Sequence, residues 1–218
     1  MEQIQNNRVI TDLYRENAQF PGIALDGSDV YLCWQRFVDR HDSLMASCRR
    51  GDEVVWEREI SDGGEVLHPV ILAHGGAIWY AWSEYARENW RILARCYRDG
   101  QWGEVLTVAS GEALFFPRLF TWQGKLHVIW TEQHKGSAAA VLCPLTEAGP
   151  GAAETVSVVG EAYRAGAAEG GDGNLYVAYD GFDGKQYKLF ARARTAAGWS
   201  EEIVVSQGED WASTPWLS

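Results

Sequence analysis

Aromatic and charged side chains gather in the segments that follow a recurrent Trp or Tyr, and this mixture suits a small polar ligand. An aromatic ring stacks on the C–H face of a sugar, while carboxylate and guanidinium groups bond its hydroxyls. Alternatively, the aromatic side chains only cover strand edges. We expect the candidate ligand-binding residues to be Arg36, Phe37, His68, Glu84, Tyr85, Trp90, Glu132, Asp180, Phe182, Tyr187 and Trp211.

The residue types that hold metals or cofactors are not spaced for that role. No C-x-x-C or H-E-x-x-H pattern occurs, and Gly171–Gly173 lacks the third glycine of a dinucleotide-binding fingerprint. The cysteines occupy small apolar slots of a repeat, so we expect reduced core residues rather than disulfides. The sequence predicts no metal, no cofactor and no catalytic residue. The four cysteines are Cys33, Cys48, Cys96 and Cys143.

An internal repeat predicts the elements that position these residues. Four segments align without a gap, namely Pro21–Trp34, Pro69–Trp82, Pro117–Trp130 and Gly166–Tyr179. Each holds a turn doublet followed by an alternating apolar run, which is typical of a β-hairpin, and two further strand-like pieces follow. A unit of four strands, A to D, in about 48 residues indicates a β-propeller blade.

The fold class is therefore all-β, a single β-propeller with four complete four-stranded blades. We expect blades at residues 21–68, 69–116, 117–165 and 166–214. Strands alternate in direction, so the B–C and D–A loops share one face, and the candidate ligand-binding residues fall on that face. Arg36, Glu84, Glu132 and Gly181 each stand two positions past the recurrent aromatic, where we expect them to ring the mouth of the central channel.

The two ends of the chain match parts of a further blade. Arg8–Thr11 resembles a leading strand D, and Thr214–Ser218 resembles the start of a strand A. Residues 1–20 and 215–218 then form a partial blade whose middle strands are absent. Because a propeller avoids exposed sheet edges by closing its circle, we expect a homo-oligomer, with residues 1–20 and 207–218 at the contact.

The charge and hydropathy patterns exclude several partners. With 19 Lys and Arg against 30 Asp and Glu, the net charge is −11, which argues against a nucleic acid or an anionic membrane. No run of eighteen apolar residues and no secretory signal sequence occurs, so the expected location is cytoplasmic by default.

The repeat resembles bacterial sialidase-like and TolB-like propeller repeats. The resemblance rests on the Pro slot, the Gly turn, the run into Trp, and strand D openings such as Gln101–Glu104 and Gly198–Glu201. It spans Arg8 to Ser218 and implies the propeller architecture. Such repeats occur as binding or scaffold modules and within glycoside hydrolases. The sialidase Asp-box is not met, and no spacing selects an arginine triad.

Three functions follow from these observations. The first is a non-catalytic binding module for a carbohydrate or another small polar ligand on the B–C and D–A loop face. The second is a protein-interaction scaffold that uses the same face. The third is a fragment of a sialidase-like glycoside hydrolase. The sequence favours the non-catalytic module.

Overall fold

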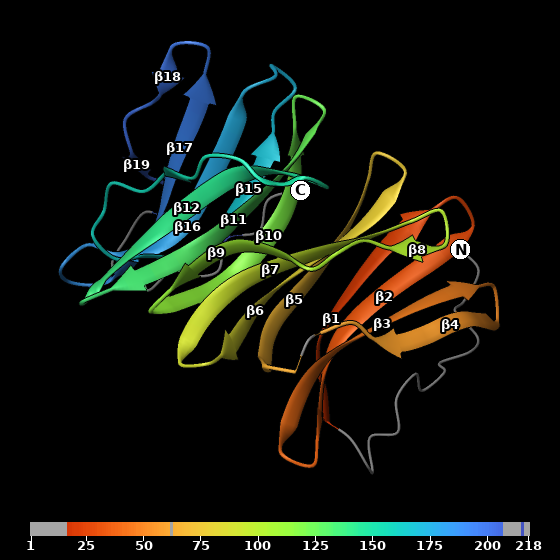
Figure 1. Ribbon diagram of the computed structural model, residues 1–218. Coiled ribbons are helices and arrows are strands. Elements are labelled where there is room, and N and C mark those ends of the chain that lie inside the picture. The colour runs from red at the N-terminus through yellow and green to blue at the C-terminus, as the bar shows by residue number, and fades with distance from the viewer. Residues whose placement is uncertain (1–16, 62, 207–214, 216–218) are drawn as a thin grey trace, which may run out of the picture.

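The computed structural model describes residues 17–61, 63–206 and 215, and every regular element among them is a β-strand. The strands form four antiparallel sheets, each built from consecutive chain segments (Figure 1). The chain is all-β, and the four sheets are the blades of a β-propeller, as the repeat predicts.

Each blade runs from an innermost to an outermost strand in chain order. Blade 1 consists of β1 (Asn17–Asp26), β2 (Asp29–Val38), β3 (His41–Arg50) and β4 (Glu53–Glu59). Blade 2 consists of β5 (Glu65–His74), β6 (Ala77–Ala86), β7 (Asn89–Arg98), β8 (Gln101–Trp102) and β9 (Leu106–Gly111). Blade 3 consists of β10 (Ala113–Trp122), β11 (Lys125–His134), β12 (Ser137–Thr146), β13 (Gly149–Pro150) and β14 (Glu154–Thr155). Blade 4 consists of β15 (Ala162–Glu169), β16 (Leu175–Phe182), β17 (Tyr187–Thr195), β18 (Gly198–Trp199) and β19 (Ile203–Val204).

The outermost strand of blades 2, 3 and 4 is divided into two short pieces that both pair with the third strand. Glycines lie at two of these breaks. The Gly103 N–H donates to the Cys96 carbonyl over 2.9 Å, and the Gly151 N–H donates to the Pro144 carbonyl over 2.8 Å. A Cβ at Gly103 would lie 2.9 Å from Cys96 Sγ, so these approaches require a residue without a side chain.

Three apolar cores fill the spaces between neighbouring blades. The recurrent aromatics Trp82, Trp130 and Tyr179 are at most 1% exposed, and each packs into the core shared with the preceding blade. The cysteines are buried free thiols, as the repeat predicts. Their slots lie in the cores, where a small apolar side chain fits.

The innermost strands contact one another in the order β1, β5, β10, β15. Among the described residues, no packing of comparable extent joins β15 back to β1. The two end blades leave aliphatic side chains in solvent. Ile23 and Leu25 of β1 are each 64% exposed, and Ile203 and Val204 of β19 are 60% and 56% exposed.

The register corrects the repeat alignment in the fourth blade. Gly166 pairs with Ala178 where Gly22 pairs with Cys33 in the first blade. Gly166 therefore corresponds to Gly22 and not to Pro21. The gap-free alignment is wrong by one residue in this strand, because the turn between β15 and β16 holds one more residue than its counterparts.

The predicted partial blade falls mostly outside the described residues. Arg8–Thr11 and Trp211 belong to that part of the chain, and no structural statement is made of them. Pro215 is described and lies beside the innermost strands. In the described ranges, no helix combines the length and the apolar character needed to cross a bilayer.

Candidate functional site

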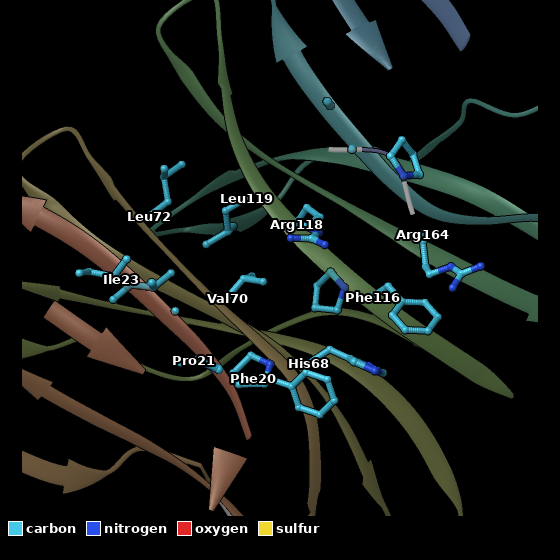
Figure 2. Close-up of a pocket in the computed structure, with 17 residues that line it drawn as sticks. Phe20, Pro21, Ile23, His68, Val70, Leu72, Phe116, Arg118, Leu119 and Arg164 are labelled. Atoms are coloured by element: carbon cyan, nitrogen blue, oxygen red, sulfur yellow. The ribbon is translucent and has the colours of Figure 1, made fainter. Parts of the chain in front are cut away.

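A pocket of about 670 Å³ opens where the four innermost strands converge (Figure 2). All of β1, β5, β10 and β15 contribute to its wall, so it occupies the central channel of the propeller. Of the described residues that line it, none is an Asp or a Glu. The lining side chains that carry rings or charge are Phe20, His68, Phe116, Arg118 and Arg164.

One position in each innermost strand has a left-handed backbone. The φ angles are +51° at Phe20, +53° at His68, +55° at Phe116 and +37° at Arg164. A β-bulge interrupts the strand register at this point in all four blades. A left-handed conformation costs a non-glycine residue about 1–2 kcal/mol. Such strain concentrates at functional sites, and all four side chains line the pocket.

The His68 imidazole lies between two aromatic rings. Its centroid is 5.1 Å from that of Phe20 and 4.3 Å from that of Phe116. Burial, assisted by the positive charge of Arg118, lowers the pKa of His68 to about 4. Its Nδ1 atom is buried and has no hydrogen-bond partner among the described residues. At neutral pH His68 is therefore an uncharged ring with a buried polar atom.

Arg164 is held at both its backbone and its side chain. The guanidinium donates to the two carboxylate oxygens of Asp180, over 3.0 Å from Nε and 2.5 Å from Nη2. The backbone N–H donates to Thr131 Oγ1 of the preceding blade over 3.1 Å. Both partners are 0% exposed, so the left-handed residue is fixed by buried polar groups. Asp180 thus supports the pocket wall without lining it.

Arg118 is the other cation in the wall. It is half-buried on β10, two residues after Phe116, and burial lowers its pKa. A guanidinium still keeps its proton at any physiological pH. The equivalent positions carry Gly22, Val70 and Gly166, so only blade 3 places a charge at this level.

An aromatic chain links the loop face to the pocket. The ring centroids of Tyr85 and Trp90 are 5.3 Å apart, and those of Trp90 and Phe115 are 4.6 Å apart. The Phe115 ring centroid then lies 6.1 Å from that of Phe116, whose ring is tilted against His68. The structure therefore brings together three of the residues expected from the sequence, Tyr85, Trp90 and His68.

The other expected aromatics that the structure describes lie elsewhere on the loop face. Phe182 and Tyr187 form a pair at 5.5 Å, and Tyr163, the neighbour of Arg164, lies 6.2 Å from Tyr187. Phe37 is 43% exposed and pairs in register with Asn17.

The charged residues expected around the channel mouth do not line the pocket. Arg36 donates to Glu59 of the outermost strand over 3.1 Å. Glu84 is 0% exposed and accepts from Trp82 Nε1 and from Arg91 within blade 2. Glu132 is exposed on β11. These side chains belong to the second strands of their blades, whereas the described residues that line the pocket lie on the innermost strands, apart from Pro215.

Sequence reasoning missed Phe20, Phe116, Arg118 and Arg164. The signal was available for two of them, because Phe20 and Phe116 stand in the same repeat position as His68, directly before the proline slot. Comparing that position across the copies would have selected both. In the fourth copy the one-residue shift hides Arg164. No group of three or more His, Cys, Asp or Glu among the described residues is placed to hold a metal ion.

No protein-family model and no curated protein matches the chain. Solved structures do resemble it. A thermostable family-43 glycoside hydrolase shares 10% identity with a TM-score of 0.57, over 89% of this chain and 73% of the other. A mannose phosphorylase from Leishmania mexicana, solved with phosphate ion, shares 9% identity with a TM-score of 0.58, over 87% and 68%.

A xylan β-1,4-xylosidase from Bacillus halodurans shares 15% identity with a TM-score of 0.54 over 87% of this chain. The chain spans only 42% of the length of that xylosidase. Similarity at these identities shows the fold alone. That fold is a β-propeller of the kind found in glycoside hydrolases.

Proposed function

We propose that the protein is a non-catalytic module that binds a carbohydrate in its central channel. One observation carries the proposal: the pocket wall combines aromatic rings in contact with one another and a few polar groups, and no described lining residue is a carboxylate. Glycoside hydrolysis normally needs two carboxyl groups on either side of the scissile bond. A wall of rings and cations supplies binding without that pair.

The structural neighbours support the ligand class. They include a xylan β-1,4-xylosidase, a family-43 glycoside hydrolase and a mannose phosphorylase. The aromatic chain from Tyr85 to His68 offers successive faces on which sugar rings can stack. Tyr85 and Trp90 would contact a glycan outside the channel, and Phe182 and Tyr187 would do so on the opposite side of the mouth.

A fragment of a glycoside hydrolase, of the sialidase-like kind or another, is the second candidate. This candidate is favoured because the chain spans only 42% of the length of the xylosidase. In that case the catalytic carboxylates would come from a part of the protein outside the described residues. A protein-interaction scaffold on the same loop face is the third candidate, for which the exposed Phe37 and Tyr85 are the support.

We propose also that the protein forms a homo-oligomer. The aliphatic side chains exposed at the two end blades, Ile23 and Leu25 on β1 and Ile203 and Val204 on β19, are the surfaces that a second copy would cover. Light scattering after size exclusion tests this point. A single species at the 24.3 kDa of the monomer would contradict it.

A glycan array, followed by isothermal titration of the best ligand, tests carbohydrate binding. Trp90→Ala should weaken binding by about tenfold, since it removes a stacking ring next to the channel. Tyr176→Ala is the matched control, because Tyr176 is exposed beside the turn between β15 and β16, on the opposite face. Turnover of fluorogenic glycosides would instead support the hydrolase, and absence of glycan binding with capture of a defined protein partner would support the scaffold.

A further inference from the structure

The pocket wall has two levels along the innermost strands. The first, which we call the bulge level, is the left-handed position of each strand, and it carries aromatic side chains, a histidine and an arginine. Three residues further along each strand the wall is aliphatic in all four blades, and these residues share one register position. We call this the aliphatic level, and it consists of Ile23, Ile71, Leu119 and Ala167, all of which line the pocket.

The cores between the blades hold the aliphatic level in place. Ile71 and Leu119 are half-buried and pack against two of these cores, and Ala167 belongs to the third. Ile23, in the end blade, is 64% exposed. Apolar surface that faces a cavity gains free energy when an apolar group covers it. The aliphatic level is therefore a fixed surface that favours an apolar group of a ligand.

The two levels lie at different depths of one cavity. A strand rises about 3.3 Å per residue, so three residues separate the levels by roughly 10 Å. Figure 2 shows Ile23 and Leu119 towards one end of the pocket and Phe116 towards the other. The cavity of about 670 Å³ falls within the range of about 300–1,000 Å³ that encloses a drug-sized ligand. A single sugar ring at the bulge level therefore leaves the aliphatic level uncovered.

The apolar part of the wall ends one step deeper. Two positions after Leu119, on the same side of β10, stands Thr121, whose Oγ1 is hydrogen-bonded to His74 Nδ1 over 3.2 Å. Neither Thr121 nor His74 lines the pocket. An apolar group that fits the aliphatic level is therefore short.

We propose that the channel binds a glycoside with a short aliphatic aglycone, the sugar at the bulge level and the aglycone at the aliphatic level. This inference rests on the proposed carbohydrate binding and names its ligand class. Each innermost strand starts at the loop face, so His68 lies nearer to that face than Ile71. The aglycone therefore enters first, and the sugar stays within reach of Tyr85 and Trp90 through the aromatic chain.

The test compares ligands that differ only in the length of the aglycone. Isothermal titration of the full chain uses methyl, butyl, hexyl and octyl glycosides of xylose, of mannose and of the sugar that the glycan array selects. Full burial of one methylene strengthens binding by about fourfold. We expect a gain of at least about tenfold from methyl to hexyl, and of no more than about twofold from hexyl to octyl, because the aliphatic level is then covered. Hexan-1-ol, which lacks the sugar, should bind at least about tenfold more weakly than the hexyl glycoside.

Variants then locate the aglycone. Ile23→Ser should reduce the gain from methyl to hexyl by at least about threefold and leave binding of the methyl glycoside within about twofold. Leu25→Ser is the matched control, because Leu25 lies on the same strand and is equally exposed at 64%, but does not line the pocket. Leu119→Ala should reduce the gain in the same way as Ile23→Ser. Circular dichroism checks that the three variants fold.

Equal affinity of the wild-type protein for methyl and hexyl glycosides would overturn the inference while the proposed carbohydrate binding stands. Equal losses in Ile23→Ser and Leu25→Ser would also overturn it, because the aglycone would then bind outside the channel. Binding of hexan-1-ol as tight as that of the hexyl glycoside would overturn carbohydrate binding and leave only an apolar site. If no glycoside of any length binds, both proposals fail.

Discussion

Acid should destabilise the fold through His68, and the size of the effect follows from its surroundings. The ordinary pKa of histidine is 6.5, and burial between Phe20 and Phe116 beside Arg118 lowers the pKa of His68 to about 4. Between these two values the unfolded chain binds more protons than the folded one. The free energy of unfolding therefore falls as the pH drops from 6.5 towards 4, and this contribution levels off below 4.

Each pKa unit corresponds to 1.36 kcal/mol, so the full difference amounts to about 3 kcal/mol. His68 is only partly buried, and solvent on its open side reduces this figure. We expect His68 alone to lower the free energy of unfolding by about 2 kcal/mol by pH 4.5. Many carboxylates also titrate in this range, so the contribution of His68 has to be isolated by a difference between variants.

Urea unfolding followed by tryptophan fluorescence at pH 7.5 and at pH 4.5 provides that difference. His68→Asn should lose about 2 kcal/mol less than the wild type on acidification, whatever its stability at neutral pH. His41→Asn, at an exposed position, should behave as the wild type. If His68→Asn shows the same pH dependence as the wild type, the imidazole is not desolvated between Phe20 and Phe116.

Three further predictions follow from the contacts. Trp82→Ala should lower the free energy of unfolding in urea by about 3–5 kcal/mol, because a fully buried ring is lost. Trp90→Ala should lower it by less than half of that. Equal losses for the two variants would make Trp90 a structural residue. Asp180→Ala should lower the free energy of unfolding by about 3 kcal/mol, since Arg164 loses its buried partner. The double variant with Arg164→Gln should recover part of this loss. An Asp180→Ala variant as stable as the wild type would show that the ion pair contributes nothing. Reductant should not shift the melting temperature, and a thiol reagent should react slowly with the native protein. The reason is that burial raises the pKa of Cys143 to about 11 and leaves all the cysteines as protonated free thiols. Disulfides found by mass spectrometry would contradict the assignment of the cysteines to the core.

The repeat allowed the architecture to be predicted because a blade depends on features that each copy must carry. A glycine turn, an alternating run and a buried aromatic recur, and each is needed to form a hairpin and to fill the space between blades. Trp82, Trp130 and Tyr179 therefore lie where the repeat places them. The fourth turn was misaligned because loops accept an added residue at little cost.

The candidate site was predicted less well, for a physical reason. Side chains such as Arg36 and Glu84 are charged and differ between copies, so the sequence predicts them at the channel mouth. In the structure each finds a partner within its own blade, Glu59 for Arg36 and Arg91 for Glu84. Sequence spacing gives the face of a strand to which a residue belongs. It does not give the partner that a long side chain selects.

The residues that face the channel were hidden by a backbone irregularity. A β-bulge at the position before the proline slot places Phe116 and Arg164 in the pocket wall, and a bulge leaves no mark in the hydrophobic alternation. The proline marks it in three copies, which is why His68 was selected. The fourth copy has Ala165 there, so Arg164 could be recognised only from the register.

The pocket of this protein of net charge −11 is lined by two cations, Arg118 and Arg164. Surface charges separated by more than about 8–10 Å are screened by physiological salt, whereas charges in a partly desolvated channel are screened much less. The ion pair between Arg164 and the buried carboxylate of Asp180 is therefore screened less than the charges on the surface. The positions of the repeat are therefore of two kinds. Those that all blades share hold the frame, and those that line the channel and differ between blades set what the channel binds.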